Sequence, residues 1–277
     1  MQGAFSQISY WDRVAHEKCF SHPLRVDWLA RYLTNPAARI LDYGCGYGRT
    51  LAELSRAGYT RVVGTDFSQA MLGRARREVP HSMLVRNDGS ALPVKSESID
   101  AVLLFAVLTC IPGSNDQRVV LAEIERVLRP GGLLYISDVL VNSDLRNRER
   151  YERHAEKYEC YGVFELPEGV VVRHHEKEWI AEITGPFHRQ EYEQFNVTTM
   201  NGNVSAAFQY LGRKQRAVRP HPGRVPDLSP EIFLFQNLTP GSPAVTSTLP
   251  GCCTLFSCFR WSALRCDHRL LSDSLSG

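Results

Sequence analysis

The sequence predicts an α/β fold, built on a mostly parallel β-sheet with helices on both faces. Two observations carry this prediction. Short apolar runs that are typical of buried strands alternate, over residues 39–138, with amphipathic segments that are typical of helices. Several of these runs, such as residues 101–105, are apolar at nearly every position, as in parallel strands that are covered on both sides.

The predicted elements follow one another in the order that such a sheet requires. The predicted strands are 39–43, 61–66, 83–86, 98–105 and 133–138. The predicted helices between them are 50–57, 69–78 and 117–128. Gly58 suits the end of the first helix and Ser68 the N-cap of the second, whereas residues 129–132 predict a sharp turn after the third. Two helices, beginning near Tyr10 and Pro23, precede the first strand and either cap a ligand site or cover a sheet edge.

The chain changes character twice after residue 141. Residues 142–158 are charged and helical, which indicates a surface helix or a lid. Residues 188–198 and 205–213 alternate as strands do, which predicts an antiparallel hairpin at the sheet edge. From Arg219 on, proline, glycine and serine are dense and periodicity disappears, so we expect a mostly disordered tail. The predicted parts are a helical cap (1–36), a ligand-binding core (37–141), a lid or substrate insertion (142–180), the hairpin (181–216) and the tail (217–277).

Composition narrows the function classes. The net charge of +2 gives no reason to expect a nucleic-acid or membrane partner, so we expect neither. The most apolar run, 101–111, is far shorter than the ~20 residues of a membrane span, and no signal peptide is evident. Cys19, Cys45, Cys110 and Cys160 are widely scattered, as free thiols are, which predicts a cytoplasmic protein. The oligomeric state is left open.

The chain is organised around the glycine-rich turn that follows the first predicted strand. Gly44, Gly46 and Gly48 separate this strand from a helix that opens at Arg49. Glycine allows φ > 0 and lets a ligand lie against the main chain, while the free N–H groups of the helix N-terminus face that ligand. The spacing departs from the dinucleotide pattern G-x-G-x-x-G, because Arg49 stands where the third glycine would be.

Asp66, at the end of the second predicted strand, indicates a ribose. An ionised carboxylate only accepts hydrogen bonds, so it can bind the hydrogens of both ribose hydroxyls. The same arrangement recurs in nicotinamide enzymes, and a plain N-cap to the next helix is the simpler alternative. Asp66 therefore points to a nucleoside, not to one cofactor.

Four segments in order resemble the class I S-adenosylmethionine (SAM) dependent methyltransferases. The pattern D-x-G-x-G-x-G over 42–48 resembles their motif I, and residues 65–72 resemble D-x-S-x-x-M-L after the second strand. Residues 87–93 resemble the segment after the third strand, and 128–132 the L-x-P-G-G turn before the fifth. The resemblance runs from about residue 10 to 214. It implies a Rossmann-like fold with a seven-stranded, mostly parallel sheet that ends in the antiparallel hairpin.

The resemblance also implies which residues bind SAM. Phe67 and Met71 would form apolar walls beside the adenine, although Met71 could equally be ordinary core. Asp88 would accept from the adenine amino group, and Gly89 or Ser90 would donate to a ring nitrogen. The remaining expected cofactor-binding residues lie in the turn, at the end of the fourth strand and before the first strand: Asp42, Gly44, Cys45, Gly46, Gly48, Phe105, Ala106 and Tyr10. Asp100, at the other end of its strand, is expected to be structural.

The implied reaction is an in-line transfer of the sulfonium methyl group to a small-molecule acceptor whose reacting atom the sequence does not identify. Aromatic faces can hold a sulfonium, and Tyr10, Trp11 and Tyr47 are candidates. The imidazoles available as a base are His16, His22, His154, His174 and His175. Three aromatic residues of the insertion could line the acceptor pocket: Tyr158, Tyr161 and Phe164.

Metal sites are disfavoured. Adjacent histidines in an extended segment face opposite ways, so we expect His174 and His175 to be exposed to solvent rather than to bind an ion with Glu176 and Glu178. The tail could supply a zinc site, but its adjacent cysteines do not match the usual spacing. Those tail residues are Cys252, Cys253, Cys258, Cys266 and His268.

Two other functions compete with methyl transfer. An NAD(P)-dependent oxidoreductase would share the turn and Asp66, but Arg49 and the lack of a hydride-transfer partner disfavour it. A non-catalytic SAM-binding module would bind SAM without turnover. Deletion of residues 219–277 should leave cofactor binding intact if the tail is not part of the fold.

Overall fold

The computed structural model describes residues 7–87 and 91–215. These residues belong to one of the two compact units of the chain, Met1–His221. The second unit, Pro222–Gly277, lies outside the described residues. The predicted tail and its cysteines therefore lie outside them too, as do Asp88, Gly89 and Ser90.

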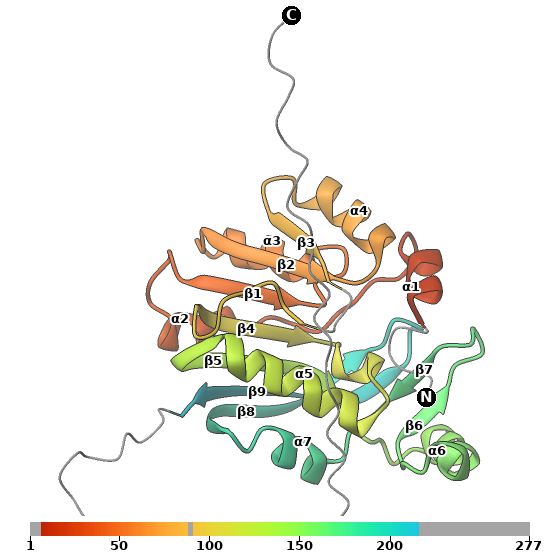
Figure 1. Ribbon diagram of the computed structural model, residues 1–277. Coiled ribbons are helices and arrows are strands. Elements are labelled where there is room, and N and C mark those ends of the chain that lie inside the picture. The colour runs from red at the N-terminus through yellow and green to blue at the C-terminus, as the bar shows by residue number, and fades with distance from the viewer. Residues whose placement is uncertain (1–6, 88–90, 216–277) are drawn as a thin grey trace, which may run out of the picture. The chain divides into compact units, whose positions relative to one another are not determined.

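A seven-stranded sheet forms the centre of the described unit, in the order β3-β2-β1-β4-β5-β9-β8 (Figure 1). The strands are β1 (Arg39–Tyr43), β2 (Arg61–Asp66), β3 (Met83–Arg86), β4 (Ile99–Phe105), β5 (Leu128–Val139), β8 (Phe187–Thr198) and β9 (Val204–Lys214). The first five are parallel to their neighbours, and β9 and β8 add an antiparallel hairpin beside β5. The predicted mostly parallel sheet and its closing hairpin are confirmed. The strand order reverses between β1 and β4, so a crevice is expected at their carboxyl ends.

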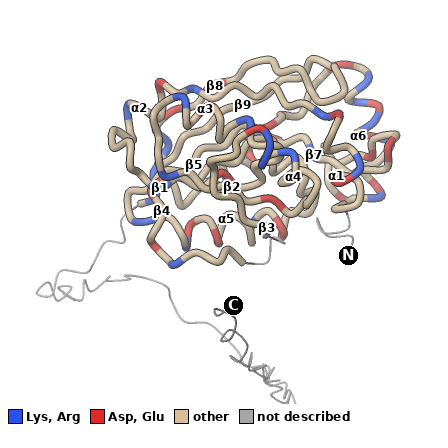
Figure 2. The backbone as a smooth tube through the Cα atoms, turned by 90° about the horizontal axis from the view of Figure 1, so that it is seen from above, with Lys and Arg blue, Asp and Glu red and all other residues tan. Residues whose placement is uncertain are grey.

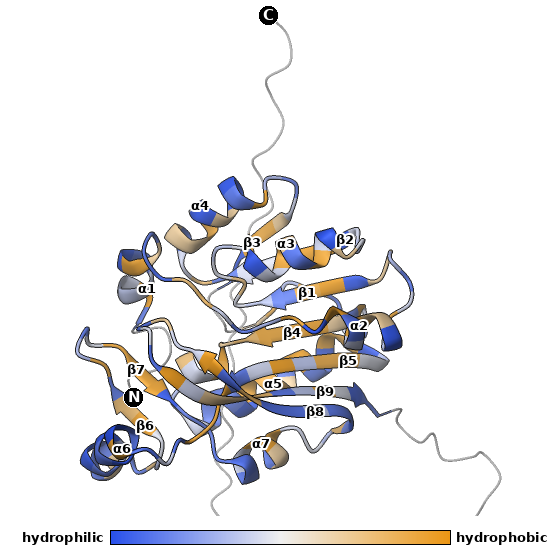
Figure 3. Cartoon of the chain, turned by 180° about the vertical axis from the view of Figure 1, so that it is seen from behind, coloured by the Kyte–Doolittle hydropathy of each residue, from blue (hydrophilic) through white to orange (hydrophobic). Residues whose placement is uncertain are grey.

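Helices cover both faces of this sheet, as predicted. They are α1 (Ile8–Val14), α2 (Val26–Tyr32), α3 (Arg49–Arg56), α4 (Gln69–Glu78), α5 (Ser114–Val127), α6 (Leu145–Tyr158) and α7 (Lys177–Ile183), with a short 3-10 helix, η2 (Leu108–Cys110). Seen from behind, α2, α3 and α4 lie in front of the sheet, whereas α5 and α7 lie on the other face (Figures 1 and 3). The helices α1 and α6 and a two-stranded sheet of β6 (Val163–Glu165) and β7 (Val171–Arg173) gather at the carboxyl ends of the parallel strands (Figure 1).

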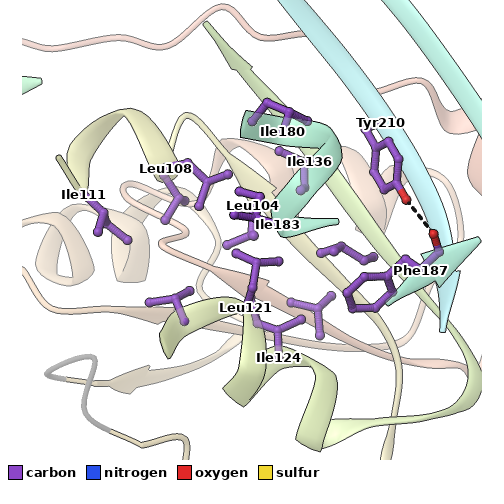
Figure 4. Packing of buried hydrophobic residues seen from close by; sticks show 14 of the residues in the cluster. Leu104, Leu108, Ile111, Leu121, Ile124, Ile136, Ile180, Ile183, Phe187 and Tyr210 are labelled. Atoms are coloured by element: carbon purple, nitrogen blue, oxygen red, sulfur yellow. Dashed lines mark hydrogen bonds between the residues drawn. The ribbon is translucent and has the colours of Figure 1, made fainter. Parts of the chain in front are cut away.

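Alternate residues of β4 enter two separate cores, which explains why this strand is apolar throughout. Leu104 packs with α5 and α7, in a cluster that contains Leu121 and Ile180 (Figure 4). Leu103 packs on the opposite face, in the cluster that contains Trp28 of α2. Burying both faces excludes water from the strand and leaves only its carboxyl end open to a ligand.

A buried hydroxyl joins the two strands of the hairpin within the cluster of Figure 4. Tyr210 of β9 donates from Oη to the backbone oxygen of Phe187 at 3.2 Å (Figure 4). Ile183 of α7 lies in the same cluster. The helix α7 thus covers the sheet, although the sequence grouped it with the predicted lid.

Two details at the amino ends of the strands bear on predictions. Asp100 forms an ion pair with Arg129 Nε at 2.5 Å and accepts from the backbone N–H of Arg39 at 2.7 Å, which fits the structural role expected for it. Strand β5 begins at Leu128, before the sharp turn predicted over 129–132. That segment leaves the pairing with β4, because Leu128 pairs with Ile99 and Leu133 with Ala101, and Gly131 has the φ of +79° of a tight turn.

No described helix is long and apolar enough to cross a membrane.

Candidate functional site

A pocket opens at the carboxyl ends of β1, β2 and β4, around the glycine-rich turn. We call it the glycine-turn pocket; Asp42, Gly44, Gly46, Asp66 and Phe105 are among its lining residues. It encloses about 640 Å³, its open mouth included. Its place is the point where the strand order reverses, so the fold brings together here residues that are distant in sequence.

The three glycines of the turn all have left-handed backbone, with φ of +72° at Gly44, +54° at Gly46 and +87° at Gly48. A Cβ on Gly44 would lie 2.6 Å from Cγ2 of Val107, so packing excludes a side chain there. A Cβ on Gly46 would meet nothing closer than Phe20 Cε2, at 3.8 Å. The backbone at Gly46 is therefore open to a ligand, as the sequence predicts.

Asp66 ends β2 with its carboxylate held by the main chain. Its Oδ2 accepts from the N–H of Gly46 and its Oδ1 from the N–H of Ser68, both at 2.8 Å. The N-cap of α4 is Ser68, whose Oγ accepts from the N–H of Met71 at 3.1 Å, so capping does not account for Asp66. Burial raises the pKa of Asp66 to about 6, although both backbone donors lower it. Each oxygen keeps a lone pair that a ligand hydroxyl can use.

Asp42 is buried in the same pocket with an unsatisfied oxygen. Only 1% of the residue is exposed, and its Oδ2 has no hydrogen-bond partner among the described residues. Burial raises its pKa to about 7, against the charge of Arg49, which lowers it. Because an orphaned buried carboxylate oxygen is costly, this atom is suited to a donor or a cation of a bound molecule.

A second cavity of about 690 Å³ adjoins the first, again with its open mouth included. Four residues line both: Trp11, Phe20, Ala106 and Cys110. We call the second one the arginine cavity, after Arg146 and Arg150 of α6, which line it. Ala106, at the shared wall, has a φ of +56°, a conformation that non-glycine residues adopt at a cost and that clusters at binding sites.

Two histidines line the arginine cavity. Nδ1 of His22 lies 3.0 Å from Ser137 Oγ, and Nδ1 of His174 lies 2.6 Å from Tyr151 Oη. Burial, followed by the charge of Arg49, lowers the pKa of His22 to about 4. Burial also lowers the pKa of His174 well below its usual 6.5. Both imidazoles are therefore neutral at pH 7.

Comparison with known proteins assigns the core. Residues 41–136 match the family model described as a methyltransferase domain. This core is therefore similar to a methyltransferase domain. A trans-aconitate 2-methyltransferase of Azoarcus sp. (strain BH72) is 36% identical over 129 residues, which cover 46% of this chain and 49% of the relative. A phthiotriol/phenolphthiotriol dimycocerosates methyltransferase 1 of Mycobacterium ulcerans (strain Agy99) is 35% identical over 117 residues, which cover 40% of this chain and 41% of the relative. The chain thus spans half or less of the length of these relatives.

Solved structures agree with this methyltransferase fold. A SAM-dependent methyltransferase of Methanosarcina mazei has a TM-score of 0.64 at 23% identity, over 69% of this chain and 98% of that one. The 1,6-didemethyltoxoflavin-N1-methyltransferase of Burkholderia thailandensis has a TM-score of 0.51 at 20% identity, over 74% of this chain and 79% of that one. It was solved with 1,6-didemethyltoxoflavin and S-adenosylhomocysteine bound.

The glycine-turn pocket fits SAM, the cofactor that the resemblance to SAM-dependent methyltransferases implies. The fit rests on the orphaned Oδ2 of Asp42, which suits an ammonium group, and on the free lone pairs of Asp66, which suit ribose hydroxyls. The open backbone at Gly46 lets a ligand approach.

Most of the predicted cofactor residues with described positions do line this pocket, and their contacts with SAM stay a prediction. They are Asp42, Gly44, Cys45, Gly46, Asp66, Phe67, Met71, Phe105 and Ala106. Gly48 does not line it; it begins α3, and a Cβ there would lie 2.6 Å from Val79 Cγ2. Asp88, Gly89 and Ser90 lie outside the described residues.

Tyr10 is placed elsewhere. It lines a separate hollow beside Gln7 and Glu168, whereas its neighbour Trp11 lines both cavities. Successive helical residues point about 100° apart, so only one of the pair can face the turn. Of the three aromatic candidates for the sulfonium, Trp11 and Tyr47 lie at the glycine-turn pocket and Tyr10 does not.

The expectation that His174 and His175 are exposed is wrong. Only 5% and 0% of these residues is accessible. His175 hydrogen bonds with Val139 O at 3.1 Å and Gln117 Nε2 at 3.0 Å, because the chain after β7 runs back beside β5. No group of metal-ligating side chains that could hold an ion occurs in residues 7–87 and 91–215.

Of the aromatic residues predicted for an acceptor pocket, Phe164 lines the arginine cavity. Tyr158 and Tyr161 do not: Tyr158 Oη donates to Glu165 at 2.5 Å, and Tyr161 packs against Tyr151. Sequence reasoning missed Arg146 and Arg150, which looked like part of a solvated helix face. Their spacing of four residues, which puts both on one side of α6, was the available signal.

Proposed function

We propose that this protein transfers the methyl group of SAM to a small molecule bound in the arginine cavity. The observation that carries the proposal is the shared wall: a cofactor-shaped pocket and a second cavity meet at Trp11, Phe20, Ala106 and Cys110. Such adjacency lets an acceptor atom lie next to the cofactor, and positioning of this kind can lower a barrier by ~7–11 kcal/mol.

In this proposal the chain binds and orients SAM and the acceptor and excludes water from between them. SAM supplies the methyl group, which leaves its sulfonium sulfur. Asp42 and Asp66 hold the cofactor, and the backbone at Gly46 lies against it. Trp11 and Phe20 close the space between the two cavities with aromatic surface. A neutral hydroxyl or amine acceptor needs a base, and the two neutral imidazoles that line the arginine cavity, His22 and His174, are the candidates.

The names of the relatives support a small-molecule acceptor without identifying it. One is named for trans-aconitate, another for phthiotriol and phenolphthiotriol dimycocerosates, and the Burkholderia enzyme for a toxoflavin precursor. These acceptors differ widely in size, so none is carried over. A cytoplasmic location and the absence of nucleic-acid and membrane partners stay predictions; the free Cys19, Cys45, Cys110 and Cys160 are in keeping with a reducing compartment.

The first test is titration of the full chain with SAM, with S-adenosylhomocysteine and with NADH in a calorimeter. We expect the first two to bind and NADH not to bind. Failure of both adenosyl ligands would end the proposal, and tight NADH binding would restore the oxidoreductase alternative.

The second test is turnover. Purified protein is incubated with methyl-labelled SAM and a fractionated metabolite extract, and labelled products are identified by mass spectrometry. We expect a labelled product that is absent when the Asp66→Asn variant replaces the wild type. SAM binding without labelled product in any fraction would favour the non-catalytic SAM-binding module.

A further inference from the structure

The arginine cavity carries positive charge without a counter-charge. Arg146 and Arg150 line it, and none of its lining residues is Asp or Glu. The two arginines lie four residues apart on α6, so they share one side of the helix, and like charges at this spacing disfavour the helix slightly. Along the rest of α6, basic and acidic residues are interspersed (Figure 2). The two arginines line the cavity, and only Arg146 has a carboxylate near it, Asp144.

Arg150 is the better enclosed of the two. Its guanidinium carbon lies 3.7 Å from the centre of the Phe164 ring, and its Nε is buried without a hydrogen-bond partner among the described residues. No ion pair of Arg150 occurs there either. Arg146 has Asp144 at a loose 3.9 Å. Burial, and less strongly the charge of Arg146, lowers the pKa of Arg150, as expected of a cation that has lost water without gaining an anion.

Other polar atoms of the cavity are hydrogen-bond donors without acceptors. Trp11 Nε1 and Ser205 Oγ are buried and have no partner among the described residues. Tyr151 Oη accepts from the N–H of Asn142 at 3.3 Å and lies 2.6 Å from Nδ1 of His174. In the tautomer in which Tyr151 donates to this nitrogen, the His174 proton is on Nε2, and the imidazole is a donor as well.

Apolar side chains make up another part of the wall. Phe20, Phe164 and Leu166 line the cavity together with these donors. A ligand that satisfies the cavity has two parts: oxygen atoms that accept hydrogen bonds and carry negative charge, and an apolar body.

We propose that the methyl acceptor is an oxyanion, a carboxylate or a phosphate monoester, whose anionic group binds to Arg150 and Arg146 and whose apolar part packs on Phe20 and Phe164. This inference rests on the proposed function, because it takes the arginine cavity as the acceptor site. Arginine binds both kinds of oxyanion through two parallel N–H···O bonds, which lysine cannot make.

The test uses full-length protein saturated with S-adenosylhomocysteine and matched pairs of probes. Phenylacetate is compared with phenylacetamide, and phenyl phosphate with phenol, by isothermal titration up to about 10 mM. We expect at least one anion to bind about tenfold or more tightly than its neutral partner, since charge-assisted hydrogen bonds to arginine are worth that much. Which of the two anions binds better decides between carboxylate and phosphate.

The variants are Arg150→Met, Arg150→Lys and, as a matched control, Arg148→Met. Arg148 is exposed on another side of α6 and lines neither cavity. We expect Arg150→Met to lower the anion affinity to that of the neutral probe, Arg150→Lys to lower it partly, and Arg148→Met to leave it unchanged. All three should bind S-adenosylhomocysteine like the wild type, which shows that they are folded.

The inference is overturned if no anion binds, if the neutral probes bind equally well, or if Arg150→Met and Arg148→Met behave alike. Each of these results can occur while S-adenosylhomocysteine still binds and a methylated product still forms. In that case only the assignment of the acceptor as an oxyanion is wrong. If the wild type does not bind S-adenosylhomocysteine at all, the proposed function itself is wrong.

Discussion

The two adjoining cavities differ in how the chain builds them. The glycine-turn pocket takes most of its lining from three short segments, each at the carboxyl end of a neighbouring parallel strand. The arginine cavity draws on α1, α6, β6, β7 and the loop between β8 and β9, which are spread over most of the described chain. Only the glycine-turn pocket can therefore be predicted from local sequence patterns.

They differ equally in charge. The glycine-turn pocket holds two buried carboxylates, Asp42 and Asp66, beside one guanidinium group, Arg49, whereas the arginine cavity holds two guanidinium groups and no carboxylate. A cationic cofactor and an anionic acceptor would each meet complementary charge. The contrast means that substitutions in the glycine-turn pocket and in the arginine cavity can test the proposed cofactor site and the proposed acceptor site separately.

The largest effect is expected from Asp66→Asn. The amide replaces a charged acceptor of two backbone N–H groups and of the ligand hydroxyls, so the affinity for S-adenosylhomocysteine should fall about 10- to 100-fold. Isothermal titration measures it. Asp100→Asn is the control, because that carboxylate lies at the opposite end of the strands and should leave the affinity unchanged. Equal losses in both variants would show that Asp66 acts only through the fold.

A smaller effect is expected from Gly44→Ala, which tests whether packing at the turn requires a glycine. The new Cβ would lie 2.6 Å from Val107 Cγ2 on a backbone with φ of +72°. We expect a loss of about 1–3 kcal/mol in the free energy of unfolding, measured by urea denaturation.

Adding Val107→Ala should restore part of that stability, because it removes the clash while the backbone strain remains. If Gly44→Ala alone is as stable as the wild type, the glycine is not required by packing.

The sequence was sufficient for the sheet and for the pocket whose residues adjoin its strands. Alternation of strands and helices predicts the parallel order, and the position of Asp66 at a strand end predicts its place beside Gly46. The same reasoning failed where distant segments meet. Arg150 belongs to a helix whose charges resemble a solvated face, and His175 belongs to a polar segment. Arg150 is half-buried against Phe164 and His175 is fully buried, because in each case a distant part of the chain packs against the residue.

Local geometry also escaped prediction where two patterns look alike. A proline followed by two glycines over 130–132 predicts the turn, but only the pairing with β4 shows that the strand begins before it, at Leu128. Tyr10 and Trp11 are adjacent aromatic residues, and only the rotation of α1 decides which faces the pocket.

The pH dependence of cofactor affinity should be more modest. Asp66 has a pKa of about 6 in the ligand-free protein, and donors on the ligand would lower it. Below pH 6 the free protein gains a proton on Asp66 that the ligand must displace, so the contribution of Asp66 to the affinity is full above this pH. It should fall by at most about tenfold per unit as the pH falls further.

Titrations with S-adenosylhomocysteine from pH 5 to 8 measure this slope, and Asp66→Asn should lack it. Any slope that remains in that variant near pH 7 belongs to Asp42, whose pKa is about 7. A flat profile in the wild type would mean that neither carboxylate faces the ligand.

The smallest effect is expected at the wall between the two cavities. The backbone N–H of Phe20 donates to Tyr47 Oη at 3.2 Å, and the two rings stack with centroids 5.9 Å apart. Tyr47→Phe keeps the stack and removes the hydrogen bond, so we expect a loss of about 0.5–1.5 kcal/mol in unfolding free energy. Because Phe20 lines both cavities, the affinity for S-adenosylhomocysteine and the affinity for the anion that binds, phenylacetate or phenyl phosphate, should weaken together. Each should fall by less than about threefold. A change confined to one ligand would show that the wall serves only that cavity, and the two sites would then be less closely joined than their shared residues indicate.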